Sequence, residues 1–344
     1  MRIFFLLSAL VWAGLIPAQT PTSIEAVEYD PLGQRWFVSN GSSLLVTDNQ
    51  GIDWSFFGEA QATHGMEVMG NHLFAIGDNV IRAYDLGDAS EVGSLSIPGV
   101  GFLNGMGNDG ASLLVVSDFS SGRLYTVDAS DPTQMTSALL AGNFGETPNG
   151  VVVDVENNRA IVVCWYSDAP ILAVDLESGE VTPLVDGTGL GNLDGIDDDG
   201  NGAYYVSSWA PTRITRYTSE FTESETVVTG AGGLSNPADI SYAVGIDTLG
   251  VANSGNDNVT FHGFSTSSVA NLHLALDASR WGQDLSVQLP KATLVKVQAW
   301  DVSGRLCFER SEFLPSGRVR FPLPALPTGA VIRVEAGGAV RTVR

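Results

Sequence analysis

Side chains that can bind a metal ion or accept a proton recur at a nearly constant interval along the chain. The interval is 39 to 45 residues, and each of these residues stands at or just before the start of an apolar, β-branched run. Carboxylate and amide oxygens suit hard cations such as Ca²⁺, and histidine is the side chain best able to move protons near neutral pH. The recurring residues are Glu25, His64, Asn104, Asn149, Asp194 and, in the sixth position, Ala238 or Asp239.

Each recurring residue opens a unit of about four short strands. In the fourth unit, TPNGVVVD is followed by AIVVCWY, PILAVDL and EVTPLVDG, with Gly, Asn, Asp and Ser between them. Runs of β-branched and aromatic residues between such turns indicate an all-β protein. Six units of roughly 40–45 residues predict a six-bladed β-propeller. A β-sandwich with extra strands is the alternative, but it would not repeat one motif at constant phase.

In a propeller the first strand of every blade lines the central channel, so equivalent residues at the strand starts form a ring around the axis. Amide oxygens and carboxylates that converge there repel one another unless a cation lies between them, and an oxygen-only set favours Ca²⁺ over Zn²⁺. The competing interpretation is local. Asn and Asp before a strand often bond to their own backbone, and Gly105, Gly150 and Gly195 would then permit those turns.

Charge is divided unevenly between two regions. Residues 19–265 hold six arginines, no lysine and 33 of the 39 acidic residues, whereas residues 266–344 hold eight arginines, two lysines and six acidic residues. This break suggests two domains with different roles. The acidic region should repel nucleic acid and anionic membranes, so we expect neither as a partner.

The first eighteen residues, MRIFFLLSALVWAGLIPA, predict a secretory signal peptide cleaved near Ala18. One basic residue precedes an apolar run that is short for a membrane span, and small residues follow it. No later stretch of the sequence is long and apolar enough to cross a bilayer. We therefore expect a signal peptide at 1–18, a propeller at 19–265 and a small β-sandwich at 266–344, in a protein that is secreted or held on a bacterial cell surface.

The C-terminal region resembles the sorting domain of bacterial type IX secretion. The matching segments are AWDVSGRL, LPALPTGAVIRVEAGG and a short basic last strand. The family's Tyr-Pro-Asn-Pro segment is absent, and Ala330 stands where an aromatic residue usually follows the glycine. The resemblance implies that this region binds the type IX secretion machinery and is removed after export, which places the chemistry in the propeller.

The propeller region, from about residue 22 to residue 264, resembles the regucalcin/gluconolactonase family. The matching motifs are IEAVEYD, LNGMGNDG, PNGVVVD and LDGIDDDG. In that family a Glu of the first blade, an Asn of an Asn-Gly motif and an Asp of an Asp-Gly motif hold a divalent metal, with another Asn close by. The resemblance implies a divalent metal ion, most simply Ca²⁺, held by Glu25, Asn149, Asp194 and Asn104.

The related paraoxonases imply a catalytic role for His64, because ATHGMEV is similar to their His-Gly motif. The resemblance to gluconolactonases makes Asp194 a general base, whereas His64, with an expected pKa near the ordinary 6.5, is chemically the better base. A second paraoxonase histidine falls on Asp78. Phe102 stands where the gluconolactonases often have a sugar-contacting arginine, and we expect Phe102 and Phe144 to line an apolar entrance for a less polar substrate.

These features predict a secreted, metal-dependent hydrolase of a lactone or related ester, in which the metal polarises the carbonyl for attack by water. The sequence has no Gly-x-Ser-x-Gly motif, so a covalent serine mechanism is not indicated. The alternative is a non-catalytic binding propeller with a structural metal ion. We expect Trp165, Tyr166 and Trp209, at the ends of second strands, to pack between blades, with a ligand platform as the alternative. We expect DDDGNG (197–202) to form an acidic hairpin turn.

Overall fold

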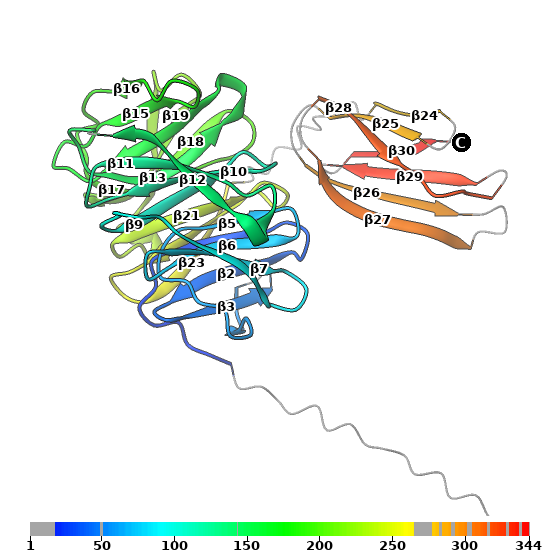
Figure 1. Ribbon diagram of the computed structural model, residues 1–344, viewed down its shortest axis with the longest axis horizontal. Coiled ribbons are helices and arrows are strands. Elements are labelled where there is room, and N and C mark those ends of the chain that lie inside the picture. Colours follow the sequence, from blue (N-terminus) through cyan, green and yellow to red (C-terminus); the bar gives the residue numbers. More distant parts are fainter. Residues whose placement is uncertain are drawn as a thin grey trace, which may run out of the picture.

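The computed structural model shows an all-β chain, as predicted (Figure 1). It describes residues 18–48, 51–142, 144–264, 277–281, 284–289, 293–300, 305–314, 317–327, 330–336 and 339–343. The predicted signal peptide lies outside the described residues, except for its last residue. The described residues up to 264 form six antiparallel sheets, coloured blue to yellow in Figure 1, and two more sheets begin at residue 277, coloured orange to red.

The six sheets are the blades of a β-propeller. Each blade is one continuous stretch of chain whose strands pair in sequence order. The first strands contact one another in a closed cycle, so they surround the axis. These inner strands are β1 (Val27–Asp30), β5 (Met66–Met69), β9 (Leu103–Asn108), β13 (Pro148–Asp154), β17 (Gly191–Asp198) and β21 (Pro237–Ala243).

The outer strands complete the blades. The second strands are β2 (Arg35–Asn40), β6 (His72–Gly77), β10 (Leu113–Asp118), β14 (Arg159–Cys164), β18 (Ala203–Ala210) and β22 (Thr248–Asn253). The third strands are β3 (Ser43–Asp48), β7 (Val80–Asp85), β11 (Arg123–Asp128), β15 (Ile171–Asp175), β19 (Thr212–Thr218) and β23 (Asn258–Gly263). The fourth strands are β4 (Ser55–Phe56), β8 (Glu91–Ser96), β12 (Thr136–Gly142), β16 (Val181–Val185) and β20 (Ser224–Thr229), and short 3₁₀ turns cover Pro132–Gln134, Val155–Asn157 and Gly230–Gly232.

Hydrophobic clusters hold the blades together. Six clusters of buried residues lie between neighbouring blades, and one of them joins Phe37 of the first blade to Leu73 of the second. The second strands read as nearly continuous apolar runs because neighbouring blades cover both of their faces. Burial of one such Leu or Phe side chain stabilises the fold by about 1.5–3 kcal/mol.

The second part has the predicted small β-sandwich. One sheet contains β24 (Asp277–Trp281), β25 (Asp284–Leu289) and β28 (Gly317–Pro322). The other contains β26 (Thr293–Trp300), β27 (Leu306–Leu314), β29 (Val331–Ala336) and β30 (Ala339–Val343). Both sheets contribute to one buried cluster that includes Val287, Val297 and Phe321, which is how two sheets pack face to face.

Candidate functional site

β-bulges set the position of the recurring residues at the start of the inner strands. In blades 3 to 6 the pairing between first and second strand shifts so that two residues of the first strand oppose one residue of the second. The two adjacent first-strand residues that form each bulge are Asn104–Gly105, Asn149–Gly150, Asp194–Gly195 and Ala238–Asp239. A bulge bends the strand and redirects the side chain of its extra residue.

Serine side chains fix two of these bulges to the next blade. The Ser117 Oγ accepts a hydrogen bond from Gly105 N (2.8 Å) and donates one to Asn149 O (2.7 Å). Ser207 does the same two blades later, with Gly195 N (2.7 Å) and Ala238 O (2.7 Å). The hydroxyl therefore satisfies backbone groups that the interrupted ladder leaves unpaired.

In blades 3 to 5 the glycine of the bulge is required by close approach of the neighbouring blade. A Cβ on Gly105 would lie 2.2 Å from Asn149 O, and a Cβ on Gly150 would lie 2.4 Å from Asp194 O. Neither these two glycines nor Gly195 has a positive φ. The interpretation of these glycines as turn-formers is therefore wrong. They lie inside or beside strands, where no side chain fits.

The sixth position of the ring belongs to Ala238. Its carbonyl oxygen accepts the hydrogen bond from Ser207, as Asn149 O does from Ser117. A Cβ added to Gly195 would lie 2.8 Å from this same oxygen. Asp239 takes the place that glycine has in the neighbouring blades, and its backbone N donates to Glu25 O (3.0 Å). Of the two residues that the sequence allowed, Ala238 is thus the equivalent of Asn149, and Asp239 lines the cavity described below.

A chain of side-chain hydrogen bonds joins three ring residues. Asn104 Nδ2 donates to Asn149 Oδ1 (2.7 Å), and Asn149 Nδ2 donates to Asp194 Oδ1 (3.1 Å) and to Leu193 O (3.1 Å). Asn149 and Asp194 are buried. The local interpretation, in which each amide bonds to its own backbone, is therefore wrong for Asn104 and Asn149, because both bond across blades.

Within the described part of the chain, no arginine, lysine or histidine forms an ion pair with Glu25 or Asp194. Burial raises the pKa of Asp194 well above its usual value, and the charges of Glu25 and Asp239 raise it further, while hydrogen bonds from Asn149 and Trp209 oppose the shift. Burial, with the charge of Asp257, raises the pKa of Glu25 to about 7. Such shifts mean that the folded chain holds negative charge here only at a cost.

The donor set fits a hard divalent cation in its chemistry. Glu25 and Asp194 supply two negative charges, and Asn104 and Asn149 supply neutral oxygens, as Ca²⁺ sites require. Among the residues that the structure describes, no group of three His, Cys, Asp or Glu side chains could hold a metal ion. The predicted set has only two such residues, Glu25 and Asp194, because its other two members are asparagines. Because Asn149 Oδ1 accepts a hydrogen bond from Asn104, a cation would replace that contact.

His64 is a neutral residue in an aromatic environment. Its ring lies edge-on to Phe102 at 4.7 Å between centroids, and its Nδ1 is 2.9 Å from Thr63 Oγ1. Burial lowers the pKa of His64 to about 4, although the charge of Asp78 opposes the shift. Burial disfavours the imidazolium, so this pKa lies below the unperturbed value of 6.5 on which the choice of His64 as the better base rested.

Phe102 and Phe144, the two predicted entrance residues, have different surroundings. Phe102 contacts His64 and is half-buried. Phe144 is also half-buried, but it packs against the cluster between blades 3 and 4 that contains Val115 and Val151. Contact of either residue with a substrate remains a prediction.

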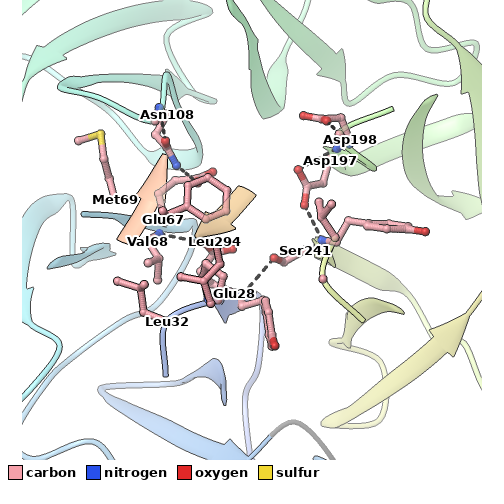
Figure 2. A pocket seen from close by; sticks show the side chains of 18 of the residues that line it. Glu28, Leu32, Glu67, Val68, Met69, Asn108, Asp197, Asp198, Ser241 and Leu294 are labelled. Carbon is pink, nitrogen blue, oxygen red and sulfur yellow. Dashed lines mark hydrogen bonds between the residues drawn. The ribbon is translucent and has the colours of Figure 1, made fainter. Parts of the chain in front are cut away.

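A second group of acidic side chains lies deeper in the channel. Glu28, Glu67, Asp197 and Asp239 line a cavity of about 920 Å³, to which residues of β26 and β27 also contribute. Figure 2 shows two bonds around this cavity: Asn108 Nδ2 donates to Glu67, and Val68 N donates to Glu28 Oε1 (2.9 Å). Burial, followed by the charges of Glu28 and Asp197, raises the pKa of Glu67 well above its usual value.

A spacing in the sequence predicts this second group, although the residues at the strand starts alone do not reveal it. Glu28, Glu67 and Asp197 each stand three residues after a ring residue, namely Glu25, His64 and Asp194. In blade 5 the bulge adds one residue, so the third residue after Asp194 again faces the channel. The segment from Asp197 does form the predicted hairpin, between β17 and β18, but its first aspartate faces the cavity and accepts a bond from Tyr242 N (2.5 Å).

Replacing Glu28 with glutamine should flatten the dependence of stability on pH. Burial raises the pKa of Glu28 to about 7, from an ordinary 4.5. The folded chain then holds a proton that the unfolded chain releases, so this contribution to stability is complete below pH 4.5 and is lost as pH rises through 7. At one pKa unit per 1.36 kcal/mol, the loss is about 3 kcal/mol.

Urea unfolding at pH 5 and pH 8 measures this effect. The wild-type protein should lose more stability between the two pH values than Glu28→Gln, because only the wild type releases the proton of Glu28. Glu67, Asp197 and Asp239 are present in both proteins. Glu59→Gln, at an exposed position, is the control and should behave as wild type. Equal losses in wild type and Glu28→Gln would contradict the raised pKa.

Comparison with known proteins identifies the fold. No protein-family model and no curated protein matches the sequence. The chain is similar to the β-propeller domain of Cps50 (Swd1) from Myceliophteria thermophila, with a TM-score of 0.52 and 7% identity over 73% of this chain and 100% of that one. It is also similar to hydrazine synthase from Kuenenia stuttgartiensis, with a TM-score of 0.50 and 14% identity over 73% of this chain and 79% of that one.

A chain of a nidogen/laminin complex gives a TM-score of 0.52 and 11% identity, over 67% of this chain and 92% of that one. At such low identities the similarity establishes the β-propeller alone. The described residues contain no helix that is long and apolar enough to cross a membrane.

Proposed function

We propose that the protein is a secreted, metal-dependent hydrolase that opens a lactone or cleaves a related ester. The observation that supports this most is the hydrogen-bonded series Asn104, Asn149 and Asp194, with Glu25 close enough to shift the pKa of Asp194. These are the four positions at which the chain resembles regucalcin and the gluconolactonases. The resemblance of the C-terminal region to type IX sorting domains supports export, and fractionation of the producing cells checks it.

Glu25, Asn104, Asn149 and Asp194 would hold a divalent cation, with Ca²⁺ as the best match to an oxygen-only set. When bound, such an ion polarises a carbonyl group and stabilises negative charge on its oxygen. The chain's own residues would then accept the proton of an attacking water. The water oxygen bonds to the carbonyl carbon, the ester C–O bond breaks, and the proton passes to the departing alkoxide.

Asp194 and His64 are the two candidates for the proton acceptor. His64 is uncharged at neutral pH, so a ring nitrogen is free of the extra proton, but a pKa of about 4 makes it a weak base. The resemblance to gluconolactonases points to Asp194, whose pKa burial raises in the chain alone and a bound cation would lower again. Asp194 is therefore our first choice, and His64 then helps to orient the water or the substrate.

A non-catalytic binding propeller with a structural metal ion is the second candidate. The hydrogen bonds from Asn104 to Asn149 and from Asn149 to Asp194 already connect three blades, which is what a purely structural ring would do. One structural relative comes from a nidogen/laminin complex, so a propeller of this fold occurs in a protein assembly.

Metal analysis and a substrate panel distinguish the two candidates. The full-length protein should contain about one equivalent of Ca²⁺ after dialysis, and it should hydrolyse members of a panel of lactones and aryl esters. A chelator should abolish the activity, and added Ca²⁺ should restore it. A protein that binds Ca²⁺ but leaves the whole panel intact would favour the binding propeller, and activity that survives complete metal removal would contradict the proposed mechanism.

A further inference from the structure

Five aromatic rings form a continuous arc at the ring of recurring residues. His64 contacts Phe102 (4.7 Å between centroids), Phe102 contacts Phe119 (5.8 Å), Phe119 contacts Trp165 (6.1 Å), and Trp165 contacts Trp209 (4.8 Å). All four contacts are edge-to-face, which is a favourable geometry for aromatic rings. The arc spans blades 2 to 5, so its members come from four separate stretches of chain.

The arc lies at the same end of the channel as Asn104, Asn149 and Asp194. Phe119 follows the second strand of its blade and donates its backbone N to Phe102 O (2.8 Å), two residues before Asn104. Trp209 donates its indole N–H to Pro237 O (3.1 Å), next to Ala238 of the ring, and its side chain opposes the rise in the pKa of Asp194. The aromatic surface and the polar ring are therefore adjacent.

The arc is more than packing between blades. All five side chains remain half-buried, whereas the hydrophobic residues that join the blades, such as Phe37 and Leu73, are fully buried. Half-exposed aromatic side chains beside a few convergent polar groups are typical of small-molecule sites. The earlier expectation that Trp165 and Trp209 only pack between blades is thus incomplete.

The charges around the ring limit what can bind. The charged groups that act on His64, Glu25 and Asp194 are all acidic: Asp78 on His64, Asp257 on Glu25, and Glu25 and Asp239 on Asp194. A bound Ca²⁺ would offset the charges of Glu25 and Asp194, but Asp78, Asp239 and Asp257 would still repel an anionic ligand. A neutral ligand with a planar, apolar part meets the aromatic arc without that penalty.

We propose that the arc binds the planar, apolar part of an uncharged ligand, and that the preferred substrate is an aromatic ester or lactone whose carbonyl lies toward Asn149 and Asp194. The second clause rests on the proposed hydrolase function, and the first does not. Phe119, Trp165 and Trp209 are then specificity-determining residues, which set the class of substrate without taking part in the reaction.

Binding is tested with amides, which resemble the esters but resist hydrolysis. The probes are acetanilide, N-methylacetamide and 4-acetamidobenzoate, measured by calorimetry and tryptophan fluorescence on the full-length protein with Ca²⁺. Acetanilide should bind at least about tenfold more tightly than N-methylacetamide, and the anionic benzoate should bind more weakly than acetanilide. Phe119→Leu and Trp165→Ala should each weaken acetanilide binding by about tenfold.

Phe56→Ala is the matched control, because Phe56 is half exposed on the outer strand β4 and should leave binding unchanged. Phe119→Leu keeps apolar volume, so it remains informative if Trp165→Ala does not fold. Equal binding of acetanilide and N-methylacetamide, or variants that match the control, would overturn the proposal. Acetanilide binding by a protein that hydrolyses no ester would support the arc and refute the hydrolase.

Discussion

An Asp194→Ala variant should lose Ca²⁺ binding and lower ester hydrolysis at least about a hundredfold, the usual effect of removing a group that stabilises charge in a transition state. Asp194 is a buried carboxylate that accepts a hydrogen bond from Asn149. Without metal, the same change removes repulsion between Asp194 and both Glu25 and Asp239. The stability of the metal-free variant should therefore equal or exceed that of the wild type.

Two thermal melts separate these effects. Ca²⁺ at a hundred times its Kd should stabilise the wild type by about 2.7 kcal/mol and leave Asp194→Ala unchanged. Asp194→Asn keeps an acceptor for Asn149 Nδ2 but removes the charge, so it should behave like the alanine variant toward Ca²⁺. A variant that keeps both the Ca²⁺-induced shift and full activity would show that the site is elsewhere.

A Gly105→Ala variant should lose about 3 kcal/mol of stability, near the upper end of overpacking effects. The new methyl group would lie 2.2 Å from Asn149 O and 2.8 Å from Gly150 Cα, and these are backbone atoms that cannot move aside alone. To make room, blades 3 and 4 must separate at the ring. That movement would also break the Asn104–Asn149 hydrogen bond.

Urea unfolding measures this loss, with Gly142→Ala as the control. Gly142 lies on the outer strand β12, where an added Cβ meets only Leu139 Cδ2 at 3.7 Å and φ is not positive. Its replacement should be neutral or slightly stabilising, because alanine restricts the unfolded chain more than glycine does. Equal stability of the two variants would mean that the blades at the ring tolerate a wider spacing.

The fold could be predicted from the sequence because one local motif recurs in blades 3, 4 and 5, where the inner strands approach one another closely. Asn104–Gly105, Asn149–Gly150 and Asp194–Gly195 pair a side chain aimed at the axis with a residue that permits close backbone approach. Each pair stands at the start of the inner strand of its blade, so the pairs recur along the sequence at the length of one blade. The alternating and apolar runs between the pairs then specify the strands, and the two-sheet C-terminal region follows from the same patterns.

The details of the site depended on distances that no pattern contains. Blade 6 has no glycine at the bulge, so only the bond from Ser207 to Ala238 O identifies Ala238 as the ring residue. The pKa of His64 depends on how deeply Phe102 and its other neighbours bury the ring, which spacing along the chain does not reveal. The arc joins rings from four blades, and its continuity depends on side-chain orientation.

The closed cycle of inner strands also concentrates the entropic cost of folding at one place. Five of the six contacts between neighbouring blades join parts of the chain that follow one another, so each requires only a short loop to close. The sixth joins β1 to β21, where Asp257 Oδ1 accepts a bond from Ser23 N, 234 residues away (2.6 Å). Loop-closure entropy grows with the length of chain enclosed, so this seam carries the largest such cost of any junction in the propeller.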